Sequence, residues 1–196
     1  MADVHDVAAA VLGATGPESP MKLQKLLYYA QAWHLARYDE PMFAARIEAW
    51  RRGPVVPEVY LRHRGQTEVG PWDEGDPARL SDRERSVVHD VVRRYGGFSR
   101  HELSDMAHAE EPWRDARGDL PETEPSTAPL SNRVMARYFR RLTSAPEEAF
   151  ADAVASVRLE GLEVPEDTRA TMRAVAAGEL TMDEAIAREI EALRRS

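Results

Sequence analysis

Apolar residues recur with a helical period along much of this chain. The clearest set lies three and four positions apart: Leu23, Leu26, Leu27, Ala30 and Trp33. Ser19-Pro20 stands in front of this set and is typical of a helix N-terminus, with a capping serine followed by a proline in the first turn. The pattern predicts a helix with a buried face over residues 20–38.

Three further helices are indicated by caps and by apolar spacing. The sequences Ser81-Asp-Arg-Glu84 and Ser99-Arg-His-Glu102 have the spacing of a capping box, in which serine and glutamate satisfy the first backbone groups of a helix. They predict one helix that ends at Gly96-Gly97 and a second that ends near residue 109, before Pro112. Apolar residues spaced for one helix face predict another helix over 134–142.

The segments between these helices are predicted to be mostly irregular. Residues 43–51 fit neither a helical nor a strand period, so we expect at most a small β element there. Two prolines and a glycine in 53–57 predict a turn, after which Pro57 opens a short helix through Arg64. Residues 65–80 and 117–130 are rich in proline, glycine and polar residues and are predicted to be loops.

The last part of the chain is organised differently from the rest. Caps at residues 144–147 and 181–184, together with Pro165, predict three short helices, which bury little apolar surface by themselves. We therefore expect a mainly α protein: a compact helical domain over residues 1–143 with at most a small β element, followed by a tail of three short helices over 144–196.

Charge is distributed unevenly along the chain. The formal net charge is −8, and residues 147–196 hold 12 acidic and 6 basic residues, which leaves −2 for residues 1–146. This balance argues against nucleic-acid binding and makes the tail a suitable ligand for a basic groove on another protein. The chain has no cysteine, no secretory signal and no apolar run long enough to span a membrane, so we expect a cytoplasmic protein.

No sequence motif indicates catalysis, a cofactor or a metal site. The phosphate loop, the GxSxG nucleophile motif and the HExxH zinc motif are absent. His101 and His108 lie two helical turns apart, too far to share one ion, and nothing converges in sequence on Glu110 and Glu111. The chain is therefore not expected to be an enzyme or to bind a metal or cofactor.

Two other groups of side chains have alternative interpretations. Lys22 and Lys25 share one helix and are suited to contact phosphate, but the solvated flank of a core helix is the preferred interpretation. Trp33, Trp50 and Trp113 are predicted to lie in the core, whereas Trp72, in a loop beside acidic residues, is the better candidate for an exposed contact.

Three stretches in the first part of the chain resemble one known family. They are MKLQKLLYYAQAWHLA, IEAWRRGPVVPEVY and LSDMAHAEEPW, and in this order and spacing they resemble the Panacea domain, which includes the SocA-like antitoxins. The resemblance covers roughly residues 4–142. It implies a mostly helical antitoxin domain that neutralises a toxin encoded beside it, usually by direct binding, and it does not define the type of toxin.

The resemblance also indicates which residues of this domain matter. They either bind the toxin or maintain the fold: Lys22, Gln24, Lys25, Trp50, Gly53, Pro54, Val55, His108, Pro112 and Trp113. Gly53 and Pro54 have a structural interpretation as residues of a turn.

The tail is similar to a second family. Residues 149–193 resemble the small VbhA-type antitoxins that inhibit Fic toxins, whose inhibitory helix carries serine or threonine, three spacers, glutamate, and glycine or asparagine. The matching residues are Ser156, Glu160 and Gly161 in ASVRLEG, and the later GELTMDEAI resembles the start of that group's third helix.

The spacing of this motif suits the inhibition that the resemblance implies. Ser156 and Glu160 lie four positions apart, so a helix presents both on one face. Fic enzymes transfer a nucleotide from ATP, or phosphorylate in the Doc branch, and hold the nucleotide phosphates with arginines. A glutamate paired with such an arginine occupies a phosphate position. The alternative is that Glu160 is a solvated residue near a helix C-terminus, where a carboxylate is mildly unfavourable.

The sequence therefore predicts an antitoxin that forms a hetero-oligomer with a Fic or Doc-like toxin and silences it through Ser156, Glu160 and Gly161. Two alternatives keep the antitoxin role. In one, the Panacea domain neutralises another class of toxin, and in the other the chain is an adaptor that presents its toxin to a protease.

Overall fold

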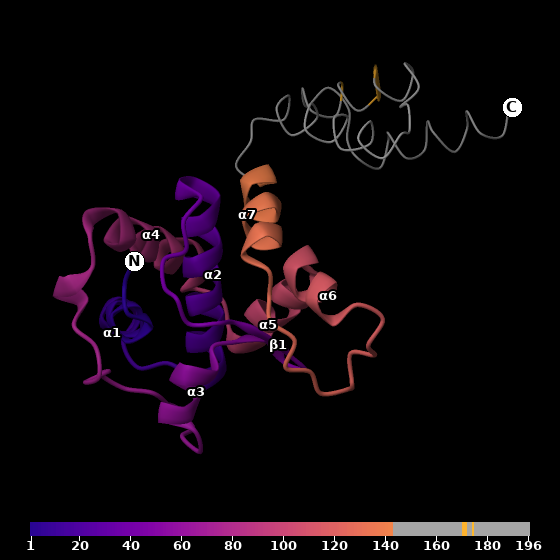
Figure 1. The fold of residues 1–196 in the computed structure, drawn as a ribbon. Helices are drawn as coiled ribbons and strands as arrows, with labels where there is room; N and C mark the ends of the chain where they lie inside the picture. The colour runs from indigo at the N-terminus through magenta and orange to yellow at the C-terminus, as the bar shows by residue number, and fades with distance from the viewer. Residues whose placement is uncertain (143–169, 172–173, 175–196) are drawn as a thin grey trace, which may run out of the picture. The chain divides into compact units, whose positions relative to one another are not determined.

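The structure is a computed structural model that describes residues 1–142, 170–171 and 174 (Figure 1). The chain divides into two units, Met1–Arg140 and Arg141–Ser196, and the fold described below is that of the first unit. The domain boundary between residues 143 and 144 stays a prediction. The described residues of the tail are helical and lie within the second of its three predicted helices.

Helices make up most of the described part of the chain. The α-helices are α1 (Val4–Thr15), α2 (Pro20–Tyr38), α3 (Pro57–His63), α4 (Asp82–Tyr95), α5 (Arg100–Ala109), α6 (Glu111–Arg117) and α7 (Asn132–Arg141). A short 3-10 helix spans Pro77–Arg79, and strands β1 (Glu48–Trp50) and β2 (Gly53–Val55) form one antiparallel hairpin. The mainly α fold with a small β element is therefore confirmed.

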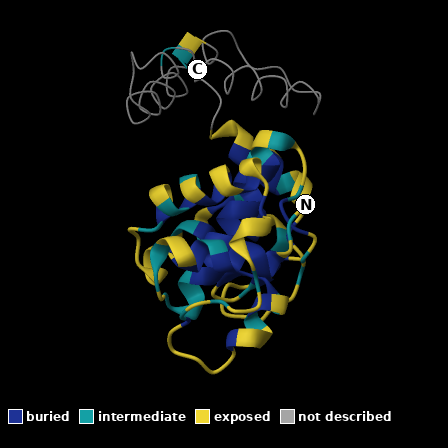
Figure 2. Ribbon diagram, turned by 90° about the vertical axis from the view of Figure 1, so that its left-hand side faces the viewer, coloured by how far each residue is buried: buried dark blue, intermediate teal, exposed yellow. Residues whose placement is uncertain are grey.

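Helix α2 lies at the centre of the unit. It packs against α1, α3, α4, α5 and β2, and every residue from Leu23 to Leu35 is buried (Figures 1 and 2). A helix surrounded in this way has little solvent face, so its polar residues must find partners inside the protein. The solvated flank expected for Lys25 is therefore wrong, because the hairpin and α5 cover that side of the helix.

The predicted helix boundaries are confirmed where capping residues define them. Both capping boxes form, with the Ser81 side chain accepting from the N–H of Glu84 and Ser99 accepting from that of Glu102. Ser19 caps α2 in the same way by accepting from the N–H of Lys22. These local bonds satisfy the free N–H groups of each first turn, which is why sequence alone locates these starts.

Two helices were not expected from the sequence. Helix α1 contains consecutive apolar residues, Val7 to Val11, that do not show a helical period because α1 is buried on several sides. Helix α6 contains Pro112 in its first turn, where proline costs no hydrogen bond. Pro112 therefore lies inside a helix that starts directly after α5. The prediction of an irregular segment after residue 109 is wrong at this point.

The turn predicted for residues 53–57 is also wrong in part, because Gly53–Val55 forms strand β2. Pro54 faces Ala49 in the hairpin register, and the N–H of Ala49 points away and donates to the carbonyl of Ala128 at 2.8 Å. This position of the ladder needs no N–H from the opposite residue, so Pro54 fits without losing a hydrogen bond.

Helix α7 closes the unit with an aromatic side chain. Phe139 is fully buried and makes edge-to-face contacts with the rings of Tyr28, Tyr29 and Trp33 on α2. The burial of Met135 and Phe139 agrees with the face predicted from the apolar spacing. Leu142, which was predicted to lie on this face, follows the last residue of α7 and is 53 % exposed. Among the described residues, no helix has the length and apolar character needed to cross a membrane.

Candidate functional site

The hairpin positions most of the residues that the sequence singled out in the first domain. Gly53 has a φ of 96°, a conformation that favours glycine, and a β-carbon added there would lie 2.6 Å from Cε of Lys25. The missing side chain therefore lets the chain turn and also leaves room for the lysine. Gly53 thus has two structural roles at this one position.

Lys25 extends from α2 beneath this hairpin. Its side-chain amine donates to the carbonyl of Pro54 at 3.0 Å, and the residue is only 1 % exposed. Burial lowers the pKa of Lys25 to about 7, because an ammonium ion removed from water loses its hydration. Lys25 is therefore a buried amine that changes charge near neutral pH.

Gln24 connects the next residues of the strand to α3. Its side-chain oxygen accepts from the N–H of Val56 at 2.7 Å, and its amide nitrogen lies 2.9 Å from Nε2 of His63. The amide nitrogen is a donor, so this imidazole nitrogen accepts and carries no proton. Burial also lowers the pKa of His63, in agreement with a neutral ring.

Trp113 and His108 support the opposite side of the hairpin. Their rings stack with centroids 4.3 Å apart, and the Trp113 indole donates to the carbonyl of Trp50 at 2.9 Å. Nε2 of His108 is buried and has no hydrogen-bond partner among the described residues. Burial lowers the pKa of His108, and the neighbouring Lys25 amine lowers it further.

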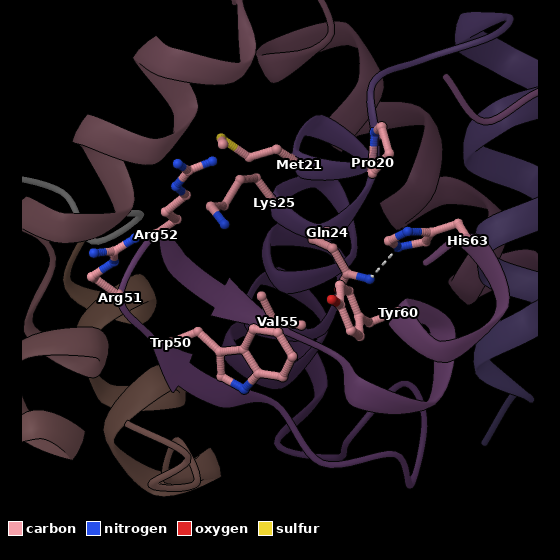
Figure 3. A pocket seen from close by; sticks show the side chains of 10 residues that line it. All are labelled: Pro20, Met21, Gln24, Lys25, Trp50, Arg51, Arg52, Val55, Tyr60 and His63. Carbon is pink, nitrogen blue, oxygen red and sulfur yellow. Dashed lines mark hydrogen bonds between the residues drawn. The ribbon is translucent and has the colours of Figure 1, made fainter. Parts of the chain in front are cut away.

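A cavity of about 340 Å³ opens between α2, α3 and the hairpin (Figure 3). Gln24, Lys25, Trp50 and Val55 from the predicted set line it, while Gly53 and Pro54 lie next to Lys25. His108 and Trp113 lie behind the hairpin and support it, and Pro112 is buried next to Trp113 in the first turn of α6. The structure therefore gathers nine of the ten predicted residues around one hairpin.

Lys22 is the predicted residue that lies elsewhere. Its amine donates to the carbonyl of Gly96 at 2.8 Å and forms an ion pair with Glu18 at 2.7 Å. These contacts join the start of α2 to the end of α4 and satisfy the charge locally. Lys22 therefore has a structural role in the described part of the chain.

Several residues of this region were not singled out by the sequence. Arg51 and Arg52 at the hairpin tip, Tyr60 and His63 from α3, and Met21 from α2 also line the cavity. A signal for the two arginines was present in the sequence, because two consecutive arginines directly before a predicted turn are expected to be exposed. No sequence signal could indicate His63, since its contact with Gln24 joins residues 39 positions apart.

Glu110 was missed as a structural residue of the core. Its two carboxylate oxygens accept from the hydroxyls of Tyr28, at 2.7 Å, and Tyr29, at 3.1 Å. Burial raises the pKa of Glu110 to about 7, although the two hydrogen bonds oppose this shift. Burial and the nearby carboxylate also raise the pKa of both tyrosines. Glu110 is thus a partner of α2 and not an exposed acid or base.

One further cluster lies outside the hairpin region. Asp3, His5 and Glu58 each offer one ligand atom, and these atoms lie within 4.8 Å of one another. The Asp3 carboxylate caps α1 by accepting from the N–H of His5, and Nε2 of His5 lies 3.4 Å from the Glu58 carboxylate. These contacts give the cluster structural roles, since Asp3 is a helix cap and His5 and Glu58 form a surface pair.

Trp72 is half-buried and not the exposed contact that the sequence favoured. Its ring stacks on His5 with centroids 5.8 Å apart, and its indole donates to Nδ1 of His5 at 3.2 Å. The predicted inhibitory residues of the tail, Ser156, Glu160 and Gly161, lie outside the described residues.

Comparison with known families indicates the class of protein, because both families that match the chain are antitoxin families. Residues 23–114 match the family described as the Antitoxin SocA-like, Panacea domain, and residues 147–192 match the family described as Antitoxin VbhA. The chain therefore combines a SocA-like Panacea domain with a VbhA antitoxin segment. No curated protein and no solved structure matches it.

These matches cover the regions in which the candidate residues lie. The Panacea match contains every predicted residue of the first domain except Lys22, and the VbhA match contains Ser156, Glu160 and Gly161. Both families imply that the partner is a cognate protein toxin.

Proposed function

We propose that this antitoxin silences a Fic or Doc-like toxin by placing the tail motif Ser156, Glu160 and Gly161 in the toxin's nucleotide phosphate site. The observation that carries the proposal is the VbhA match over residues 147–192, which contains the whole motif. The motif has the order that the inhibitory helix of that group requires.

The chemistry of inhibition follows from charge and geometry. Glu160 pairs with an arginine that otherwise binds a nucleotide phosphate, and such charge-assisted pairs are short and often bidentate. ATP then cannot adopt the pose needed for transfer. Because positioning supplies much of the rate enhancement in phosphoryl-type chemistry, a displaced phosphate is enough to stop turnover.

The two other residues of the motif have supporting roles. Ser156 stands four positions before Glu160 in the sequence, and a helix would place both side chains on the face that enters the cleft. A glycine at position 161 suits the end of such a helix and would allow the chain to leave the cleft. The antitoxin itself acts in the cytoplasm by binding and not by catalysis, as a hetero-oligomer with its toxin.

A second candidate function is favoured by the Panacea match and by the residues gathered around its hairpin. In this alternative the first domain alone neutralises a toxin, either by binding it or by delivering it to a protease. The toxin then belongs to any of several classes, and the tail is not required.

Removal of the tail separates the two candidates. The toxin encoded beside this chain is expressed in cells together with the full chain or with a chain that ends at residue 143. We expect the full chain to restore growth and the shortened chain to fail, although Met1–Arg140 is a compact unit. Circular dichroism of the purified shortened chain checks that it is folded. Full protection by the shortened chain would support the second candidate, and a fall in toxin level during protection would indicate the protease adaptor.

A further inference from the structure

The cavity beside the hairpin contains a buried lysine amine without an acidic partner. The Lys25 amine can donate three hydrogen bonds, and its bond to the Pro54 carbonyl uses one of them. Among the described residues, no carboxylate lies within ion-pair distance of this amine. A buried ammonium without a counter-ion is costly, so its position indicates either a neutral amine or an anion that binds there.

Two cations stand at the same cavity. Arg51 and Arg52 are exposed at the hairpin tip and line the cavity with Lys25, and Figure 3 shows Arg52 extending from the tip toward Met21. Neither guanidinium forms an ion pair with a described carboxylate. The neighbouring Glu48 carboxylate is already used, because it accepts from the Trp50 indole at 2.7 Å and pairs with Arg46 at 2.8 Å.

The remaining walls are flat and largely apolar. Trp50 and Tyr60 contact each other with ring centroids 4.8 Å apart, and Met21 and Val55 add aliphatic surface. The volume of about 340 Å³ lies at the lower end of the range of small-molecule sites, about 300–1,000 Å³. The site therefore combines two arginines and a buried amine with a surface on which a planar ring can lie.

We propose that this cavity binds a small phosphate monoester that carries a planar ring, of which a nucleoside monophosphate is the simplest example. Lys25 and Arg52 hold the phosphate oxygens, and the ring lies against Trp50. Two arginines and the Lys25 amine favour a phosphate over a single carboxylate, because the phosphate monoester carries a charge of about −1.5 to −2 at pH 7.

Recognition of the ring is expected to depend on shape and not on hydrogen bonding. The polar atoms of Gln24 and His63 are already bonded to each other and to Val56, so they have little capacity left for a base. Stacking on aromatic rings tolerates any base, since every base has a planar face. Adenosine and uridine monophosphates should therefore bind with similar affinity.

Calorimetric titration of the full chain with AMP, adenosine and inorganic phosphate tests the proposal. AMP should bind at least about tenfold more tightly than adenosine or phosphate, because it contacts both the cations and the ring wall. Lys25→Met and Arg52→Ala should each weaken AMP binding by about 10- to 100-fold, the usual range for a lost charge-assisted hydrogen bond. Arg64→Ala removes an exposed arginine outside the cavity and should leave the affinity unchanged.

Two results would overturn the proposal. One is the absence of AMP binding, and the other is equal AMP affinity for the Lys25→Met variant and the parent chain. Equal affinity for AMP and inorganic phosphate would overturn the assignment of a ring wall. Arg52 lies at the exposed tip, so its variant keeps the test valid if Lys25→Met does not fold, which a thermal melt checks. The outcome is independent of the tail motif, because the cavity lies within Met1–Arg140.

Discussion

Glu110 shows how one residue can make the stability of this domain depend on pH. Its carboxyl group is buried at the junction of α5 and α6 and joins that junction to Tyr28 and Tyr29 in the central helix. Its pKa is raised to about 7, mainly by burial. Between about pH 4.5 and pH 7 the folded state therefore keeps a proton that the unfolded state has lost.

Because the folded state binds this extra proton, the stability of the domain falls as the pH rises. The stabilisation from Glu110 is fully present below about pH 4.5 and is lost as the pH rises through about 7. Glu110→Gln removes the titrating group, while the amide can still bond both tyrosine hydroxyls. The free energy of unfolding of the parent chain, relative to the variant, should therefore fall by up to about 3 kcal/mol between pH 5 and pH 8.

Urea unfolding of both chains at pH 5 and pH 8 measures this difference. Comparison with the variant cancels the contributions of other titrating groups, including His63 and His108. Glu68→Gln, which changes an exposed loop carboxylate, serves as the control and should follow the parent chain. A pH dependence of unfolding that is the same in the parent chain and in Glu110→Gln would refute the role of this buried group.

At the scale of secondary-structure elements, the hairpin organises the candidate site. Three residues of its strands determine where Trp113 and Lys25 lie. The Trp50 carbonyl accepts from the Trp113 indole, and the Pro54 carbonyl accepts from the Lys25 amine. The missing side chain of Gly53 leaves room for Lys25. The hairpin is only three residues long on each side, so these tertiary contacts stabilise it more than its own ladder does.

Replacement of Gly53 tests how closely the hairpin and Lys25 depend on each other. Gly53→Ala introduces a β-carbon 2.6 Å from Cε of Lys25 at a φ of 96°. Gly65→Ala is the matched control, since its φ is 87° and nothing lies within 4 Å of the added carbon. We expect Gly65→Ala to lower the free energy of unfolding by about 1–2 kcal/mol, because alanine disfavours this backbone conformation. Gly53→Ala should lower it by roughly 1–3 kcal/mol more, because the added carbon also clashes with Lys25.

Chemical denaturation of the two alanine variants provides the measurement. A larger loss of unfolding free energy for Gly53→Ala would agree with the close packing of Lys25 beneath the hairpin. Equal losses would show that Gly53 is required only for its backbone conformation.

The elements that sequence could predict are those defined by neighbouring residues. The starts of α2, α4 and α5 follow from serine caps three positions from their partners, so local chemistry specifies them. Strand β2 could not be predicted, because Pro54 is tolerated only where Ala49 bonds to Ala128, far away in sequence.

The same distinction applies to the candidate site. The resemblance named nine residues that the structure brings together around the hairpin, but it could not separate the residues that line the cavity from those that support it. That separation depends on tertiary contacts, such as the Trp113 indole bonding to the Trp50 carbonyl. The burial of Lys25 likewise depends on elements packed around α2 on all sides.

At the scale of the whole molecule, charge and family membership divide the chain in the same way. The Panacea match lies in residues 23–114, whereas the VbhA match lies in residues 147–192, which belong to the acidic last part of the chain. An acidic segment suits the toxin of the proposed function, which binds nucleotide phosphates through arginines, because the segment and the nucleotide both present negative charge to the same site. In the proposed function, the Glu160 carboxylate silences the toxin.

The central claim is tested most directly by the rate of nucleotide transfer from labelled ATP by the purified toxin–antitoxin complex. With Glu160→Gly, the complex should still form, with a Kd within about threefold of the parent value, while the transfer rate rises by at least about tenfold. Glu163→Gly removes an acidic residue outside the motif and should leave the toxin silent. A Glu160→Gly complex that forms and remains as inactive as the parent complex would contradict the account.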